Sequence, residues 1–299
     1  MPQALSTGTR VSPDGSWMLA EAKRDNLLYL SDPYSSDVHV FSYPAVREVG
    51  MLVVDGDPEG ECDDNAGDVW VVRFLSHSAV EYRHGETSIS GSVSTGTDSP
   101  WSCAVDPITG NLAVTTNHAI DLYQSAKGDP TAYASPRDGG YESCTYDESG
   151  NLFAATSLDF IAELPKGSSQ MIDLRLSFSI YPHNIQWDQQ HRYLAISNSR
   201  YGRTDATSIY RVAVFGKAGN LVGITVLKQS KNNDPPQYWI EGSHILGTTL
   251  VERKHGHLEK RIDSWPYPAG GKPTLIGHVD RSPTDPPELH GIVISEATR

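Results

Sequence analysis

Cys103-Ala-Val-Asp-Pro-Ile-Thr-Gly-Asn-Leu-Ala-Val114 decides the fold, because variants of this stretch recur along the chain. Cys144-Thr-Tyr-Asp-Glu-Ser-Gly-Asn-Leu-Phe-Ala154 aligns with it without a gap, and so does Ile185-Gln-Trp-Asp-Gln-Gln-His-Arg-Tyr-Leu-Ala195. A further copy, Cys62-Asp-Asp-Asn-Ala-Gly-Asp-Val-Trp-Val71, fits with a shift of one residue. Each copy predicts an apolar strand, a turn that begins with Asp, and a second apolar strand. This pattern predicts a β-hairpin, since Asp and Asn-Gly sequences supply the backbone and hydrogen bonds of tight turns.

The turn aspartates set the length of the repeat. Asp64, Asp106, Asp147 and Asp188 follow one another at intervals of 42, 41 and 41 residues. Two more apolar segments follow each hairpin, so that each copy predicts four strands. A repeat of about forty residues with strand-like content is typical of the blades of a β-propeller.

Six copies of the repeat cover the chain. The fifth is divergent, with Glu241 in place of the turn Asp. The sixth inner strand is predicted at 290–295, and its outer companions lie near the other end of the chain, at 27–31, 37–44 and 50–53. Both chain ends then complete one blade, which removes open sheet edges. A competing register makes 10–15 the inner strand.

We therefore predict an all-β fold: a six-bladed β-propeller with four-stranded blades, one of them closed by both termini. It forms a single domain over residues 1–299, with a partly irregular segment at 1–26. The composition agrees with many turns, because the chain has 26 Gly and 19 Pro among 299 residues. Polar loops at 228–237 and 280–289 are predicted on one propeller face.

Charge and hydropathy exclude some partners. The formal charge is -13, from 37 acidic and 24 basic residues, which speaks against nucleic acid and anionic membranes. No apolar stretch approaches the roughly 18 residues that a membrane-spanning helix needs, so we expect no membrane insertion. The first residues lack the charged and apolar regions of a signal peptide, as they would in a chain trimmed of its export signal.

The segments Tyr29-Leu-Ser-Asp32 and Val38-His-Val-Phe41, together with the repeated Gly-Asn turns, carry a family resemblance. The chain resembles bacterial six-bladed propellers of the NHL-repeat and gluconolactonase-like superfamily. The resemblance implies either a module that binds a small molecule, glycan or protein, or a metal-dependent lactone hydrolase whose metal is held by Glu, Asn and Asp. Many bacterial members are exported, so we expect an extracellular or periplasmic monomer.

The site is expected where the loops enter the innermost strands, because these loops surround the central channel of a propeller. Aligned on the turn Asp, one rim position holds Glu59, Trp101, Glu142, His183, Pro236 and His290. The next position holds Gly60, Ser102, Ser143, Asn184, Gln237 and Gly291. The third position holds Glu61, Cys103, Cys144, Ile185, Tyr238 and Ile292. From these positions the predicted ligand-binding residues are Glu59, Glu61, Trp101, Ser102, Ser143, Asn184 and Tyr238.

Three rim residues, Glu142, His183 and His290, are the candidates for chemistry. They are predicted ligands of a divalent metal such as calcium, zinc or manganese, because imidazole nitrogens and carboxylate oxygens suit such ions. Asn184 would add an oxygen. Alternatively, one of the histidines and Glu142 act as a general base that activates water. A third interpretation treats the rim residues as solvated, with Trp101 closing the channel. A separate pair, His255 and His257, is predicted to lie at a solvated hairpin tip.

Cys62, Cys103 and Cys144 are spaced evenly, 41 residues apart, on consecutive inner strands. Cys103 and Cys144 share one register, so a bridge between these neighbours is one alternative if their Cα atoms lie within about 7 Å. The favoured interpretation is that small buried thiols fill the propeller centre, since the number of cysteines is odd.

Overall fold

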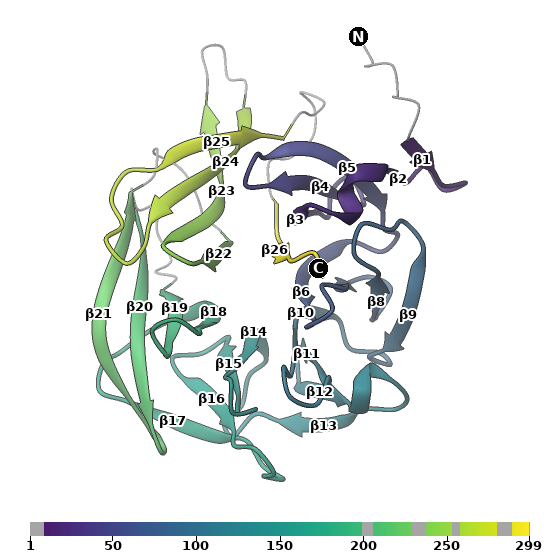
Figure 1. The fold of residues 1–299 in the computed structure, drawn as a ribbon. Helices are drawn as coiled ribbons and strands as arrows, with labels where there is room; N and C mark the ends of the chain where they lie inside the picture. The colour runs from purple at the N-terminus through teal and green to yellow at the C-terminus, as the bar shows by residue number, and fades with distance from the viewer. Residues whose placement is uncertain (1–8, 199–205, 229–236, 253–257, 280–288, 299) are drawn as a thin grey trace.

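The computed structural model of the chain describes residues 9–198, 206–228, 237–252, 258–279 and 289–298. Strands surround a central axis, and the described residues include only two short 3-10 helices, Ala20–Lys23 and Gln124–Ala126. The chain is an all-β propeller, as predicted (Figure 1). No helix within the described ranges is long and apolar enough to cross a bilayer.

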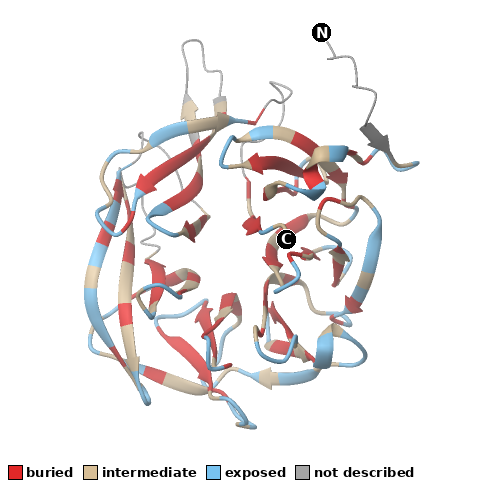
Figure 2. Ribbon diagram, in the orientation of Figure 1, coloured by how far each residue is buried: buried red, intermediate tan, exposed pale blue. Residues whose placement is uncertain are grey.

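The innermost strands form a ring in which each contacts the next (Figure 1). They are β6 (Pro58–Asp63), β10 (Pro100–Val105), β14 (Tyr141–Tyr146), β18 (Pro182–Asp188), β22 (Tyr238–Glu241) and β26 (Ile292–Ser295). The quoted repeats begin in the first four of these strands, so the sequence pattern locates the centre of the molecule. The buried residues gather on these strands and on the strands beside them (Figure 2).

Three of the sheets have four antiparallel strands each. One runs from β6 through β7 (Val69–Arg73) and β8 (Ser78–Tyr82) to β9 (Ile89–Ser94). The second runs from β10 through β11 (Leu112–Thr116) and β12 (Ala119–Tyr123) to β13 (Thr131–Ala134). The third runs from β22 through β23 (His244–Glu252) and β24 (Leu258–Pro266) to β25 (Thr274–His278).

A fourth sheet has eight strands and joins two copies of the repeat. One half comprises β14, β15 (Leu152–Thr156), β16 (Ile161–Leu164) and β17 (Ile172–Leu176). The other half comprises β18, β19 (Tyr193–Asn198), β20 (Ala206–Phe215) and β21 (Ala218–Lys228). The halves meet at their outer strands, where β17 pairs in parallel with β21 through Arg175 opposite Ala218 and Leu176 opposite Gly219.

The fifth sheet contains strands from both ends of the described chain. Its order is β1 (Thr9–Val11), β2 (Trp17–Leu19), β5 (Arg47–Val53), β4 (Asp37–Tyr43), β3 (Asn26–Asp32) and β26. β26 pairs with β3 at the centre, with Ile292 opposite Leu30. The competing register, which places 10–15 innermost, is wrong, because β1 lies at the opposite edge of this sheet. The segment expected to be partly irregular contains the β1–β2 hairpin, which pairs with β5 through β2.

The turn residues act as the sequence predicts. The Oδ1 atoms of Asp106 and Asp147 accept hydrogen bonds from the N–H groups two residues on, at 2.9 Å in both cases. The asparagine of each turn has a second role, because Asn111 Oδ1 accepts from the N–H of Ser125 and Asn151 Oδ1 from that of Lys166, both at 2.9 Å. Each turn is thereby tied to the end of the third strand of its own sheet.

Side chains along an inner strand point alternately towards the preceding and the following sheet. Cys144 belongs to a buried cluster with Ala113 and Ile120 of the preceding sheet. Ile185, which aligns with Cys144, likewise packs with Phe153 and Ala155 of β15, in the preceding half of the eight-stranded sheet. The alternation follows from the two-residue period of a strand, so a shift of one residue reverses the direction in which a side chain points.

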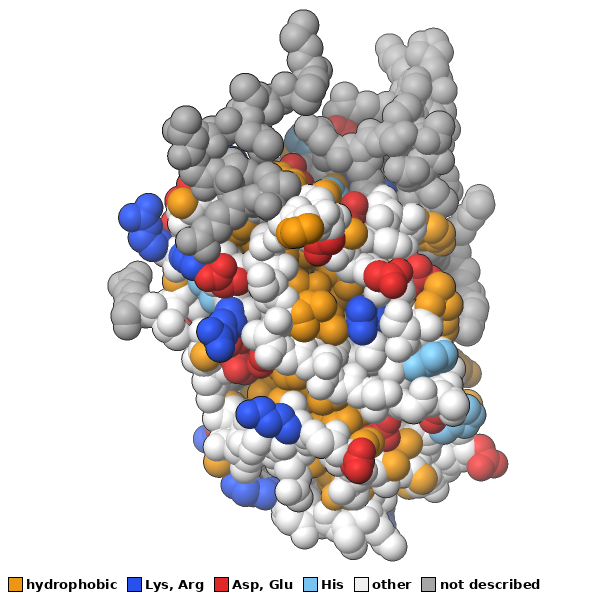
Figure 3. Space-filling model, turned by 90° about the vertical axis from the view of Figure 1, so that its right-hand side faces the viewer, with side chains coloured by type: hydrophobic (Ala, Val, Ile, Leu, Met, Phe, Trp, Pro, Cys, Tyr) orange, Lys and Arg blue, Asp and Glu red, His pale blue; other side chains and the backbone are white. Residues whose placement is uncertain are grey.

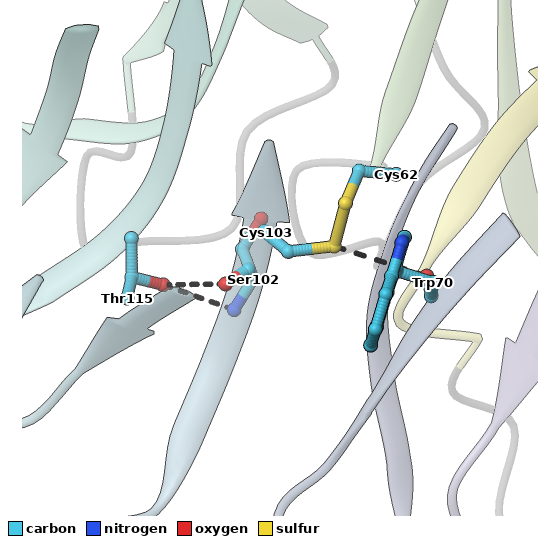
Figure 4. The surroundings of a disulfide bond; sticks show 5 residues. All are labelled: Cys62, Trp70, Ser102, Cys103 and Thr115. Atoms are coloured by element: carbon cyan, nitrogen blue, oxygen red, sulfur yellow. Dashed lines mark hydrogen bonds between the residues drawn. A yellow bond between two sulfur atoms is a disulfide. The ribbon is translucent and has the colours of Figure 1, made fainter. Parts of the chain in front are cut away.

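The cysteine predictions are corrected by a disulfide between Cys62 and Cys103 (Figure 4). The favoured interpretation of three thiols is wrong, and so is the alternative bridge from Cys103 to Cys144. Cys103 and Cys144 occupy the same position of the repeat and point the same way, so they do not face each other. Cys62 lies one residue later relative to its turn Asp, so it points towards Cys103, with Cα atoms 5.6 Å apart. Cys144 remains a buried free thiol.

Some predictions fall outside the described residues. They concern Pro236, the His255 and His257 pair, and nearly all of the loops at 228–237 and 280–289.

On the side of the molecule that carries β9, acidic and basic side chains are interspersed around an apolar patch (Figure 3).

Candidate functional site

Two of the predicted rim residues, Glu59 and His290, form a pair. Glu59 is on β6 and His290 lies just before β26, and His290 Nδ1 is hydrogen-bonded to Glu59 Oε2. The side chains are 11% and 30% exposed, so the pair is partly shielded from water. The ring of Tyr34 meets the His290 ring edge-on at 6.5 Å.

Glu142 and His183 form a second, looser pair on the neighbouring strands β14 and β18. Glu142 Oε2 lies 3.8 Å from His183 Nδ1, and about a third of each side chain is exposed. Ser143, the next residue, donates its Oγ hydrogen to the carbonyl oxygen of His183 at 3.0 Å. This serine therefore positions the backbone at His183.

Trp101 is held at the rim by its own neighbours. Its Nε1 donates to Asn117 Oδ1 at 2.7 Å, and its ring packs against Phe74 with centroids 4.7 Å apart.

The predicted metal ligands are divided between the two pairs. His290 bonds to Glu59, and β22 separates it from the strand that carries His183. In the described part of the chain, groups of three or more potential ligands within 4.8 Å are Asp32, Asp37 and His39, and Asp64, Asp68 and Glu81. The set of Glu142, His183 and His290 is not such a group. Metal binding and catalysis by these residues stay predictions.

Glu61 is the most deeply buried carboxyl group of the predicted site. Ser31 Oγ donates to its Oε1, whereas its Oε2 is buried without a hydrogen-bond partner. Oε2 lies against Gly291, where an added Cβ would come within 1.7 Å of it. Burial raises the pKa of Glu61 to about 8; the Ser31 hydrogen bond opposes this shift, and the charge of Glu59 adds to it. Glu61 is therefore mostly protonated at neutral pH.

Asn184 and Tyr238 connect two inner strands. Asn184 Nδ2 donates to the carbonyl oxygen of Tyr238 at 3.2 Å, and the Tyr238 hydroxyl donates to that of Ala195 at 2.8 Å. Gln186 continues this link, because it bonds both the N–H and the carbonyl oxygen of Ile240. These amides fix the spacing of β18 and β22.

A cavity of about 820 Å³ follows the central channel. Of the predicted site residues, its lining includes Glu61, Ser102, Asn184 and Tyr238. The other predicted residues are not among the described lining residues: Glu59, Trp101, Glu142, Ser143, His183 and His290. The cavity extends instead to the turns at the far ends of the inner strands, which we call the turn-side mouth. The predicted residues therefore line only the part of this cavity that lies nearer the rim.

The turn-side mouth has residues that the sequence prediction missed as site residues. They include Asp63 at the end of β6, Glu241 at the end of β22, and Glu296 directly after β26. One signal was available in the sequence, since Glu241 replaces the turn Asp of the repeat. Burial, together with the charges of Asp64, Glu296 and Glu241, raises the pKa of Asp63 to about 7. Burial and the charge of Glu296 also raise the pKa of Glu241, and a hydrogen bond from Trp239 opposes that shift.

No protein-family model matches this chain, and no curated protein matches it. Solved structures share its fold. Hydrazine synthase of Kuenenia stuttgartiensis is similar, with a TM-score of 0.56 and 15% identity. The matched region covers 73% of this chain and 65% of the hydrazine synthase chain. A Bacteroides caccae protein of unknown function has a TM-score of 0.65 and 8% identity, over 91% of this chain and 99% of that one. A chain of a nidogen/laminin complex has a TM-score of 0.62 and 12% identity, over 92% of this chain and 100% of that one. At these identities the likeness shows the propeller fold alone.

Proposed function

We propose that the protein is an NHL-like, six-bladed propeller that binds a small ligand in its central channel without chemical conversion. The count of six treats β14–β17 and β18–β21 as separate blades, since each half of the eight-stranded sheet repeats the strand order of the four-stranded sheets. It counts β26, β3, β4 and β5 as the blade that both chain ends close.

The cavity in the channel carries this proposal. Its volume of about 820 Å³ lies within the range of small-molecule sites. Three polar atoms of lining residues are buried without a hydrogen-bond partner: Glu61 Oε2, the hydroxyl of Tyr146 and Trp187 Nε1. Buried polar atoms are nearly always bonded, so unbonded ones beside a cavity support a ligand that completes them.

Export to the periplasm or the cell exterior fits the same proposal. The Cys62–Cys103 disulfide supports it, because disulfides persist in oxidising compartments. We propose a monomer whose ligand is a small molecule; a glycan end or a protein side chain is the alternative occupant.

A blocked channel tests the function. Ala297→Trp places a large ring at the turn-side mouth, where Ala297 lines the cavity, and Ala132→Trp is the matched control on the exposed outer strand β13. Thermal unfolding is measured with lactose, citrate, calcium chloride and spermidine. We expect at least one of these to raise the melting temperature of the wild type and of Ala132→Trp, but not of Ala297→Trp. The absence of any such shift contradicts binding in the channel.

A metal-dependent lactone or ester hydrolase is the second candidate, because each of two rim carboxylates lies beside an imidazole. Glu142 or Glu59 would position its histidine as a general base for water. Metal analysis of the purified protein before and after chelation tests this function, together with lactone and ester hydrolysis by the His183→Ala/His290→Ala double variant. Metal-free protein, or activity that survives both substitutions, rules it out.

A further inference from the structure

The channel cavity is lined by acidic side chains without basic ones. Among the described residues, its lining includes no Lys, Arg or His. The acidic side chains that line it are Glu61, which is mostly protonated at neutral pH, and Asp63, Asp64, Asp188, Glu241 and Glu296. An enclosed surface with charges of one sign attracts ligands of the opposite sign, because its low-dielectric walls focus the field.

Two of these carboxylates are already engaged in their turns. Asp64 Oδ1 accepts from the N–H of Ala66 at 2.8 Å, and Asp188 Oδ2 lies 2.9 Å from His191 Nδ1. Three acidic residues remain at the turn-side mouth: Asp63, Glu241 and Glu296. They lie at the ends of three neighbouring inner strands, β6, β22 and β26. The charged groups that shift the pKa of Asp63 are all carboxylates. Together the three groups therefore favour a bound cation that relieves their mutual repulsion.

The distances between the carboxyl oxygens of the three groups favour an organic cation over a metal ion. One metal ion needs its ligand atoms close together around a single centre. Asp63, Glu241 and Glu296 do not form a group with oxygens within 4.8 Å, although all three belong to the described residues. Their separation suits several charges distributed along one molecule.

The remaining lining supports the same class of ligand. Trp187 and Trp239 line the cavity next to the carboxylates, and aromatic rings attract organic cations. Independently, three residues of the lining have a buried polar atom without a hydrogen-bond partner, namely Glu61 Oε2, the Tyr146 hydroxyl and Trp187 Nε1, and such atoms support a bound ligand.

We propose that the channel binds an extended organic cation with two or more ammonium or guanidinium groups, held at the turn-side mouth by Asp63, Glu241 and Glu296. This inference rests on the proposed function and specifies its ligand. The cationic groups pair with separate carboxylates, while the aromatic rings cover the carbon chain between them.

Isothermal titration calorimetry of the full chain with spermidine at pH 8 and low ionic strength tests the inference. We expect one saturable site whose affinity falls as sodium chloride is added, since salt screens the charges. Asp63→Asn/Glu241→Gln should weaken binding by about tenfold or more. The control Asp129→Asn/Asp138→Asn removes the same formal charge from exposed residues away from the cavity, and should leave affinity within about twofold of the wild type.

Several results would overturn the inference. It fails if the wild type does not bind spermidine, or if both double variants bind it equally well. It also fails if calcium chloride binds more tightly than spermidine and loses that affinity in Asp63→Asn/Glu241→Gln, since the site is then a metal site. If lactose or citrate stabilises the wild type but not Ala297→Trp, and spermidine does not bind, the channel function stands and only the cationic class of ligand is wrong.

Discussion

Glu61 shows how one residue of the channel responds to its surroundings. Its carboxyl group is buried between Ser31 and Gly291, so the protonated form is favoured and its pKa rises to about 8. In an unfolded chain the carboxyl group would release this proton near its ordinary pKa of 4.5. The folded state therefore binds an additional proton between these two pH values.

Stability should consequently fall as pH rises. The contribution of Glu61 is fully present below about pH 4.5 and is lost as the pH approaches 8, by up to about 1.4 kcal/mol per pH unit. Glu61→Gln keeps the shape and removes the titration, so its free energy of unfolding should depend less on pH than that of the wild type. Urea unfolding at pH 5, 7 and 9 measures the difference. Asp129→Asn, on the exposed surface, should follow the wild type; equal slopes for Glu61→Gln and wild type would contradict the prediction.

Asp63 provides a pH dependence for the proposed ligand. Its pKa of about 7 reflects burial and the facing carboxylates Asp64, Glu296 and Glu241. Because the deprotonated form attracts a cation, the affinity for spermidine should increase from pH 6 to pH 8. Calorimetry at pH 6, 7 and 8 checks this, and Asp63→Asn should reduce the increase. An affinity that is constant over this range would show that Asp63 does not take part.

At the scale of elements, the two-residue period of the inner strands decides which neighbours meet. Cys62 and Cys103 face each other because Cys62 lies one position later in its repeat than Cys103 does. The bridge joins β6 to β10 and closes a segment of 41 residues. It therefore restricts the unfolded chain over about one repeat.

Removing this bridge should destabilise the fold. For a loop of this length, the loss of unfolded-state entropy corresponds to about 4 kcal/mol. Cys62→Ala/Cys103→Ala should lower the free energy of unfolding by an amount of this order, as measured by urea titration without reductant. Cys144→Ala, which removes the buried free thiol, is the control and should cost less. Equal unfolding midpoints for wild type and double variant would contradict the prediction.

At the scale of the whole molecule, the last inner strand closes the ring. β26 pairs with β3 and buries Ile292, Val293 and Ile294, so it completes both a sheet and the core between its neighbours. Without β26, β3 would present an unpaired edge that invites association with other chains.

A shortened chain tests this closure. A chain that ends at residue 288 should have a lower melting temperature and should elute as aggregates in size-exclusion chromatography. A chain that ends at residue 297 keeps β26 and should resemble the full chain. Monomeric behaviour and an unchanged melting temperature of the shorter chain would show that the ring does not depend on β26.

The site was predictable only in part, for a reason of geometry. Alignment of the repeats identified the residues that enter the inner strands, and the structure finds Glu59 beside His290 and Glu142 beside His183. The repeat does not show how far along the channel the cavity extends, because that depends on which side chains fill it. Asp63 and Glu296 were therefore missed, although both lie at the ends of inner strands that the repeat had located.

The sequence by itself determined the all-β class, the propeller, the positions of the hairpins and the role of the turn aspartates. These features are local or periodic, so spacing and turn chemistry suffice to define them. Only the tertiary structure decided the partner of Cys62, the merging of β17 with β21, and the acidic mouth formed by Asp63, Glu241 and Glu296. These features join residues from different repeats, and their direction depends on the alternation and closure of strands around the ring.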